Sequence, residues 1–412
     1  MNAPAGWTAR DASVFLHQHG STPALGVLRS ASGIWLEDEH GHRFIDLHGN
    51  TAHHIGHAHP RLIAAIKDQL DRLAFSPRRY SNETAVALGE KLTSHFRGGQ
   101  SRMLLATGGS DAIEIALRLA RAATGKSGII ALEGSYHGHG FGALALSSRD
   151  LDPRLGHQMP DVHHVTPYWD KAAGGADRML ADIVWVLHAH SDIACLIAEP
   201  MRSNCVVPPL GLWVDVLALC AHHGVKLIFD EKPSGLGKTG RFFAHEHFAV
   251  TPDVVVLGKA LGGGVLPIAA VLADRSLDIA PDLALGHYTH EKNPVTARAA
   301  LTTIEIIEEE GLVGQAERLG SEAEAQIHQR MQTGKTMITG IRGLGLLRAV
   351  TYRSSVPLCD DALVTDGLER GVSFTMKGRD AVGFSPPLII SDAELALALG
   401  SVCAAIDSFA EV

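Results

Sequence analysis

The sequence predicts an α/β protein, with a mostly parallel sheet covered by helices and a smaller α+β domain. The chain has 412 residues, 46% hydrophobic and 20% charged, which leaves room for two or three domains at ~100–200 residues each. Apolar strand-like runs alternate with helical patterns through the middle of the chain, and this texture changes after residue 300. Strands that are apolar throughout and separated by helices are typical of a parallel sheet buried on both faces.

The elements of the larger domain are predicted from runs of aliphatic and β-branched residues. A strand at 103–107 leads into a helix at 110–123, whose apolar residues Ile113, Leu117 and Ala120 share one face. A second helix is expected at 212–223. Further strands are expected at 128–132, 193–198, 225–230, 254–258 and 267–273.

The rest of the chain is predicted to form the smaller domain. A long helix at 295–310 continues after Gly311 through 315–331, followed by strands at 341–352 and 382–390 and helices at 361–370 and 392–409. We expect three parts: an N-terminal segment at 1–60 that joins the small domain, a large domain at 61–300, and the small α+β domain at 301–412.

Charge and cysteine usage limit the partners. With 36 Lys+Arg against 45 Asp+Glu, the net charge of -9 argues against nucleic-acid binding. No run reaches the ~18 apolar residues of a membrane span, and no signal-like stretch begins the chain. The five cysteines contain no CxxC pair and indicate buried thiols in a reducing compartment, so a cytoplasmic location is expected; they are Cys195, Cys205, Cys220, Cys359 and Cys403.

The first candidate site is the Thr-Gly-Gly-Ser-Asp segment at 107–111, between a predicted strand and helix. Glycines such as Gly108 and Gly109 let backbone N–H groups approach an anion, and a helix N-terminus adds partial positive charge. The alternative is an ordinary turn in which Ser110 caps the helix.

The second candidate is Asp230, which ends an apolar strand. Ligands of open α/β sheets bind at the carboxyl ends of strands, where a carboxylate can hold a protonated ring nitrogen; the alternative is a surface turn. The segment at 234–240 is not a nucleotide phosphate loop, because Lys232 stands where that motif needs glycine. The dinucleotide fingerprint fails similarly at Ala143.

The third candidate is Lys259, between an apolar strand and a glycine run. Poor hydration would lower its pKa, as a Schiff-base lysine requires, whereas a lysine extending from a turn into solvent is the alternative. An anion site, a ring-nitrogen carboxylate and a desolvated lysine at successive strand ends are the three features that pyridoxal phosphate needs.

The order and spacing of these motifs resemble the class III aminotransferase family of fold-type-I pyridoxal phosphate enzymes, from Gly26 to the C-terminus. Similar motifs lie at 108–112, 136–138, 199–200, 229–231 and 287–294, and Lys259 follows Asp230 by 29 residues. The resemblance implies pyridoxal 5'-phosphate as cofactor and a homodimer that shares its active sites across the interface.

The resemblance also implies roles for individual residues. Lys259, Asp230 and Tyr136 are the expected catalytic residues: Lys259 forms the Schiff base, Asp230 holds the ring nitrogen and Tyr136 stacks on the ring. The other expected cofactor contacts are Gly108, Gly109 and Ser110 at the phosphate, His137, Glu199, and Thr289 supplied to the phosphate by the neighbouring subunit.

The sequence departs from a transaminase at several positions. Members that use a 2-oxo acid usually carry an arginine where Gly383 stands, and Pro233 replaces a common glutamine. The segments at 46–50, 78–82, 232–240 and 288–292 are instead similar to a lyase branch of the family. That branch acts on (R)-1-hydroxy-2-aminoethylphosphonate, so we expect hydroxide elimination that yields phosphonoacetaldehyde and ammonia, a reaction of phosphonate catabolism.

A phosphonate dianion needs cationic partners. The candidates are Arg78, Arg79, Arg202 and Lys377, for each of which a solvated surface charge is the alternative, and His54 is a candidate for substrate contact. No metal is expected, since His57 and His59 lie in a turn that resembles a structural family segment. The rival functions are an ω-amine aminotransferase, an amine-phosphate phospholyase of the same family, and a catalytically silent cofactor-binding or scaffold protein.

Overall fold

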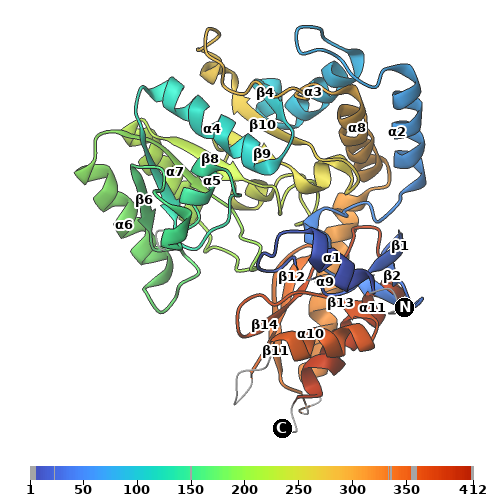
Figure 1. The fold of residues 1–412 in the computed structure, drawn as a ribbon. Coiled ribbons are helices and arrows are strands. Elements are labelled where there is room, and N and C mark those ends of the chain that lie inside the picture. The colour runs from blue at the N-terminus through green and yellow to red at the C-terminus, as the bar shows by residue number, and fades with distance from the viewer. Residues whose placement is uncertain are drawn as a thin grey trace.

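The computed structural model describes residues 6–22, 24–148, 151–332, 334, 336–353 and 360–409. Its largest sheet has seven strands in the order β4-β10-β9-β8-β7-β5-β6 (Figure 1). Only β10 runs antiparallel to its neighbours, β4 and β9, while every other adjacent pair is parallel. The strands are β4 (Ser101–Ala106), β5 (Gly128–Leu132), β6 (Val162–Val165), β7 (Ile193–Ala198), β8 (Lys226–Asp230), β9 (Val254–Leu257) and β10 (Ala269–Asp274).

Helices cover both faces of this sheet, which confirms the predicted fold class. In β7, Cys195 and Ile197 pack with α4 (Gly109–Thr124), whereas Leu196 and Ala198 pack on the opposite side. That opposite side is covered by α6 (Gly175–Ala189) and α7 (Leu212–His223) at one end, and by α2 (Pro60–Arg72), α3 (Glu83–His95) and α8 (Pro294–Glu309) at the other. Alternate residues therefore face two cores, as a buried parallel sheet requires.

Two smaller sheets contain the chain ends. One has the order β1-β2-β3-β13, in which β3 (Arg43–Asp46) pairs in parallel with β13 (Val372–Ser373) and so joins the N-terminal segment to the C-terminal region. The other has the order β11-β12-β14. The domain boundaries near residues 60 and 300 stay a prediction. The remaining elements are α1 (Trp7–Val14), β1 (Leu28–Ser32), β2 (Trp35–Asp38), α5 (Phe141–Ala145), α9 (Leu312–Met331), β11 (Ile338–Leu344), β12 (Leu347–Tyr352), α10 (Asp360–Glu369), β14 (Ala381–Phe384) and α11 (Asp392–Asp407).

Two predicted strands are wrong in extent, and one predicted helical stretch is confirmed. The strand expected at 341–352 is the hairpin of β11 and β12, which turns at Gly345 with a φ of 53°. The strand expected at 382–390 ends at Phe384, because Pro386 and Pro387 have no N–H to donate to a ladder. The helical stretch expected at 295–310 and, after Gly311, at 315–331 is confirmed as α8 and α9. Gly311 separates them, because its φ of 64° ends a right-handed helix.

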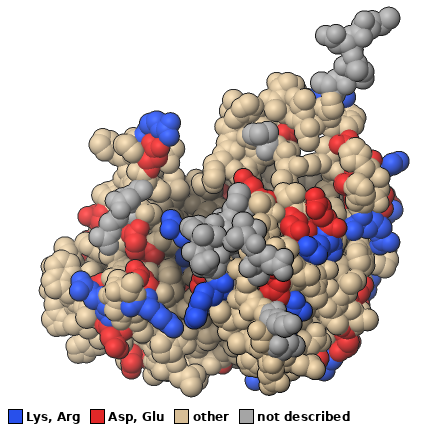
Figure 2. Space-filling view, turned by 90° about the horizontal axis from the view of Figure 1, so that it is seen from below, with Lys and Arg blue, Asp and Glu red and all other residues tan. Residues whose placement is uncertain are grey.

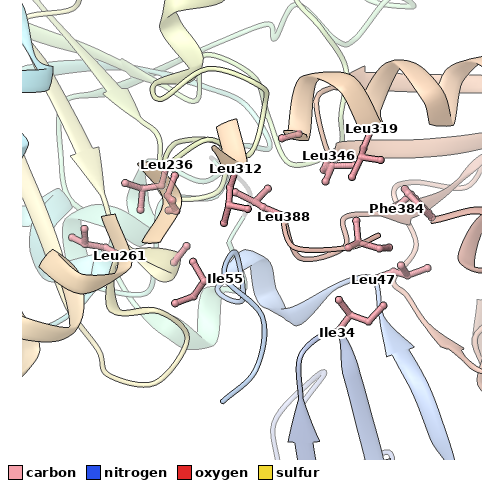
Figure 3. Packing of buried hydrophobic residues seen from close by; sticks show 14 of the residues in the cluster. Ile34, Leu47, Ile55, Leu236, Leu261, Leu312, Leu319, Leu346, Phe384 and Leu388 are labelled. Carbon is pink, nitrogen blue, oxygen red and sulfur yellow. The ribbon is translucent and has the colours of Figure 1, made fainter. Parts of the chain in front are cut away.

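One hydrophobic core connects segments that are distant in the sequence. Figure 3 shows Ile55 from the N-terminal segment on the same side as Leu236 and Leu261, which follow β8 and β9. Leu47 from the same segment lies beside Phe384 of β14, and Leu388 lies between the two groups. These residues belong to the same buried cluster. Burial of this shared apolar surface fixes the loops after β8 and β9 against the two smaller sheets.

Charged side chains of both signs lie on the surface, and the described cysteines lie inside the protein. Basic and acidic side chains are interspersed over the face seen in Figure 2. None of the helices in the described ranges is long and apolar enough to span a bilayer. Four cysteines are buried and free, while Cys359 lies outside the described residues.

Lys238 is a buried cation that links the large sheet to the C-terminal region. Its side chain is 0% exposed, and its Nζ donates to the carbonyl oxygens of Ser385 (3.2 Å) and Pro386 (2.5 Å). Burial lowers the pKa of Lys238 to about 7, although the charge of Asp46 opposes this shift. A neutral amine can still donate both hydrogen bonds, so the contact persists above neutral pH.

This depressed pKa predicts a pH dependence of stability. Above about pH 7 the folded protein loses the Lys238 proton, whereas the unfolded chain keeps it until near 10.4. Unfolding free energy should therefore rise with pH between these values, by up to about 1.4 kcal/mol per pH unit. Lys238→Met should remove this slope, measured by thermal or denaturant unfolding at about pH 7 and about pH 9. The exposed Lys171→Met is the control, and an unchanged slope in Lys238→Met would contradict the assignment.

Candidate active site

The predicted site residues gather at one edge of the large sheet. Since β10 is antiparallel to both β4 and β9, β4 runs in the same direction as β9 and the parallel strands beyond it. The carboxyl ends of β4, β5, β7, β8 and β9 therefore share an edge. The chain leaves these ends at Gly108–Ser110, Tyr136–Gly138, Glu199, Asp230 and Lys259, respectively.

The first wall of the site is the N-terminus of α4. Gly108 is the extended N-cap, and no side chain caps the helix. The alternative in which Ser110 caps the helix is wrong, because its Oγ instead accepts from the N–H of His139 at 3.0 Å. The N–H groups of the first turn have no partner within the helix and are suited to an anion. Gly138, with a φ of 137°, packs against this turn, and a Cβ at Gly138 would collide with Ser110 Oγ.

The second wall contains the ionised carboxylate of Asp230, which is fully buried, so the surface-turn alternative is wrong. Its Oδ2 accepts from His137 Nδ1 at 2.8 Å, and its Oδ1 accepts from the backbone N–H of Lys232 at 3.2 Å. The ammonium of Lys232 also lies 3.2 Å from Oδ2. Burial acts to raise the pKa of Asp230, but Lys232 and His137 together hold it below its ordinary value. Asp230 is therefore an anion able to hold a protonated ring nitrogen.

Lys259 follows β9 after a single glycine. Its φ of 49° is left-handed, a strained conformation for a residue with a side chain. The side chain is open to solvent, yet much of its surroundings is protein. This enclosure lowers the pKa of the amine, Lys232 and Lys377 lower it further, and Glu199 and Asp230 oppose them. An accessible amine with a lowered pKa is suited to attack a carbonyl carbon.

The buried Glu199 is loosely paired with the half-buried Arg202. Glu199 is 3% exposed, and its Oε2 has no hydrogen-bond partner among the described residues. Arg202 Nε lies 3.8 Å from that oxygen, and its guanidinium lies 4.9 Å from the ring centre of Trp169. Burial raises the pKa of Glu199. The Glu199 carboxyl thus retains a free acceptor site inside the protein.

Gly383 leaves space that Lys377 occupies. A Cβ at Gly383 would lie 2.9 Å from Lys377 Cε and 3.0 Å from the carbonyl oxygen of Thr375. Gly383 also donates its N–H to that carbonyl at 2.8 Å. The charge of Lys377 adds to burial in lowering the pKa values of Lys259 and His48. A side chain at residue 383 would therefore displace Lys377.

His48 lies on a turn organised by Asp46. The Asp46 carboxylate accepts from the N–H groups of His48 (3.0 Å) and Gly49 (2.8 Å) and from His57 Nε2 (2.9 Å). These bonds outweigh burial and depress the pKa of Asp46. The ring of His48 reaches Thr375, with 3.4 Å between Nδ1 and Oγ1. Enclosure and the charge of Lys377 lower the pKa of His48.

Four predicted residues lie on the surface of the chain. Tyr136 is 51% exposed, with its ring 5.5 Å from that of His139. Thr289 is exposed in the loop between β10 and α8. Arg78 and Arg79 are exposed between α2 and α3, in a loop at the top of Figure 1, and neither forms a hydrogen bond or ion pair with a described residue. Their predicted roles stay predictions.

His54 does not face an open cavity. Its side chain is 1% exposed, and its Nε2 lies 3.2 Å from the carbonyl oxygen of Gly235. Its backbone carbonyl accepts from Leu388. These contacts favour a packing role for His54 over the predicted contact with substrate.

Sequence reasoning missed two features of the site. His137 was predicted to contact the cofactor, but its pairing with Asp230 joins two motifs that lie 93 residues apart. Lys232 was considered only as the residue that breaks a nucleotide-binding pattern. Its position two residues after Asp230 was the available signal.

The donor set fits pyridoxal 5'-phosphate. The first turn of α4 offers N–H groups to a phosphate, Asp230 offers a buried negative charge to a ring nitrogen, and Lys259 offers a primary amine to an aldehyde. His137 Nε2 is buried without a partner in the described part of the chain, at the same side of the sheet.

Similarity to known proteins supports a pyridoxal phosphate site. The class III aminotransferase family model matches residues 16–406. The (R)-1-hydroxy-2-aminoethylphosphonate ammonia-lyase of Vibrio splendidus is 35% identical, over 95% of this chain and 87% of that protein. The acetylornithine aminotransferase of Mycolicibacterium smegmatis is 33% identical over 100% of both chains.

A solved structure has the same fold. The ornithine aminotransferase of Toxoplasma gondii, described with partial occupancy of PLP at its active site, superposes with a TM-score of 0.87 at 26% identity. The match covers 98% of this chain and 94% of that one. The chain belongs to the class III aminotransferase family, and its cofactor is pyridoxal 5'-phosphate.

Proposed function

We propose that this enzyme is an ammonia-lyase that converts (R)-1-hydroxy-2-aminoethylphosphonate into phosphonoacetaldehyde and ammonia. The observation that carries the proposal is the packing of Lys377 across Gly383, with 2.9 Å between Lys377 Cε and a Cβ placed at Gly383. Transaminases of the resembling kind hold a planar carboxylate with an arginine at that position, for which the packing leaves no room. A compact ammonium suits a tetrahedral phosphonate better than a planar carboxylate, which an arginine binds through two parallel bonds.

Different residues of the chain would hold different parts of the cofactor. Lys259 would hold it through its amine, and the α4 N-terminus with Gly108, Gly109 and Ser110 would receive its phosphate. Asp230 would hold the ring nitrogen, and Tyr136 would cover the ring. Thr289 from a second copy of the chain completes the phosphate site, so the active form is a homodimer.

Proton transfer is the task of the freed Lys259. When bound, pyridoxal phosphate draws electrons from the amine-bearing carbon of the substrate and acidifies it. The Lys259 amine takes the proton from that carbon. Its lowered pKa favours the neutral amine that this step needs.

The bond to the neighbouring hydroxyl then breaks, and its electron pair leaves with the oxygen. Hydroxide is a poor leaving group, so a proton must reach it, from Lys259 or from His48, whose pKa responds to both Lys259 and Lys377. The unsaturated amine that leaves the enzyme takes up water to give the aldehyde and ammonia. No oxidant or keto acid is consumed.

Two related functions differ in their products. An ω-amine aminotransferase is favoured by the likeness to aminotransferases, and it would leave the cofactor in its amine form until a keto acid restored it. A phospholyase would use the same cations but expel phosphate. A silent cofactor-binding protein is disfavoured, because both Asp230 and Lys259 have the electrostatic environment that chemistry requires.

The proposal predicts catalytic ammonia release from (R)-1-hydroxy-2-aminoethylphosphonate without any keto acid. Ammonia should exceed the enzyme many times over while the absorbance of the cofactor's aldehyde form persists. A single turnover that ends in the amine form and resumes with pyruvate would contradict the lyase and support the aminotransferase. Release of phosphate from an amine phosphate, without ammonia from the hydroxyphosphonate, would support the phospholyase.

Lys377→Met should weaken substrate binding. Loss of one charged hydrogen bond, of about 1.5–3 kcal/mol, should raise KM roughly tenfold to a hundredfold with a smaller effect on kcat. The matched control is Arg379→Met, which removes an exposed cation two residues away. Equal KM values for Lys377→Met and the wild type would remove Lys377 from the substrate site.

Lys259→Ala should abolish turnover, because it removes both the covalent attachment and the base. Borohydride reduction followed by mass spectrometry should find the cofactor attached to Lys259 in the wild type and nowhere in the variant. Retained turnover in Lys259→Ala would overturn the mechanism.

Asp230→Asn should leave the fold intact and slow turnover by about a hundredfold or more, because a neutral amide no longer stabilises the ring-nitrogen proton. Circular dichroism checks the fold, and a nearly unchanged rate would show that Asp230 is wrongly assigned.

A further inference from the structure

A second buried lysine lies in the site. Lys232 follows β8 by two residues and is only 8% exposed. Two glycines leave room for its chain: a Cβ on Gly109 would lie 2.7 Å from Lys232 Cδ, and a Cβ on Gly258 would lie 3.2 Å from Cγ. Lys232 therefore runs between the start of α4 and the residue that precedes Lys259.

The ammonium of Lys232 has three acceptors. Its Nζ donates to the carbonyl oxygens of His137 (2.6 Å) and Gly109 (3.3 Å), and it lies 3.2 Å from Asp230 Oδ2. An ammonium has three N–H donors, so this geometry satisfies it fully. The same carboxylate oxygen accepts from His137 Nδ1, so Asp230 Oδ2 is shared while Oδ1 holds only a backbone N–H.

Lys232 opposes the electrostatic effect of Asp230 on any base beside it. A carboxylate stabilises a proton on a neighbouring ring nitrogen, and a cation at ion-pair distance from that carboxylate offsets part of the effect. The other ionisable groups that act on Asp230 are His137 after β5, Glu199 after β7 and Lys259 after β9. Lys232 is the fixed cation among them that touches the carboxylate.

We propose that Lys232 is a positioning and tuning residue that shares the Asp230 carboxylate with the cofactor and lowers the proton affinity of the ring nitrogen. Asp230 remains the group in contact with the ring, and Lys232 acts through it. The lysine also fixes the Gly109 carbonyl, so the phosphate wall and the ring-nitrogen wall share one cation.

This tuning favours elimination, a step that rests on the proposed lyase function. When the substrate C–H bond breaks, its electron pair can pass to the ring system or remain on carbon. A ring nitrogen that keeps its proton through Asp230 but holds it less strongly would leave more of the pair for the new C=C bond, with cleavage of the C–O bond, and less for protonation of the cofactor carbon. Hydroxide leaves with that bonding pair and takes a proton from Lys259 or His48. A strongly protonated ring would instead favour protonation on the cofactor carbon and transamination.

The test measures the ring nitrogen itself, so it does not need lyase activity. Holoenzyme is loaded with pyridoxal phosphate carrying ¹⁵N in the ring, and the nitrogen chemical shift is followed by solid-state NMR as the pH is raised. Two variants separate charge from hydrogen bonding: Lys232→Gln keeps donors for the two carbonyls, and Lys232→Met keeps neither charge nor donors. The control is Lys377→Met, which removes a cation that does not contact Asp230.

We expect both Lys232 variants to retain the ring proton to a pH higher than wild type by about one unit or more, and Lys377→Met to have a smaller shift. If the pH at which the ring nitrogen loses its proton rises in Lys232→Met alone, hydrogen bonding and not charge is the cause, and the proposal is overturned. If that pH rises in neither variant, the proposal is also overturned. Loss of cofactor binding in both variants would also overturn it, by assigning Lys232 to the phosphate wall.

If the nitrogen shifts as expected, the cofactor of both variants should also convert more often to its amine form per turnover, without keto acid. A nitrogen shift without ammonia release by the wild type would reject the lyase and leave the Lys232 proposal standing.

Discussion

A buried negative charge at the end of the central strand is the constraint on which the site depends. Asp230 is fully enclosed, and an uncompensated charge in such a place costs several kcal/mol. His137 compensates it from the loop after β5, and Lys232 from the loop after β8. The backbone after His137 packs closely against Ser110, and only a glycine at residue 138 allows this approach. The loop that carries the partner of Asp230 therefore also contacts the start of α4.

The opposite side of the site comes from the chain ends. Asp46 organises the turn that carries His48, and the space above Gly383 admits the chain of Lys377. The common hydrophobic core and the buried amine of Lys238 fix these segments against the loops after β8 and β9. The substrate's reacting carbon and its anionic end are thus handled by two parts of the chain that fold against each other.

The sequence predicted the parts of this arrangement that are local. Apolar strands such as β5 and β7 match their expected residues, and the residues that follow them form the site edge. The strand β1 escaped prediction because nearly all of it is exposed and shows no apolar pattern. The contacts of Lys232 with Gly109, and of Lys377 with Gly383, depend on how close separate segments approach, which no periodicity in either segment encodes.

The central claim is that Lys377, in the space left by Gly383, binds the anionic end of a phosphonate substrate. A crystal structure of the holoenzyme with (R)-1-hydroxy-2-aminoethylphosphonate trapped in the Lys259→Ala variant tests it most directly. The account predicts a phosphonate oxygen within hydrogen-bond distance of Lys377 Nζ, with the amine-bearing carbon next to the position of the missing Lys259 amine. A phosphonate bound by other cations, with Lys377 turned to solvent, would contradict it.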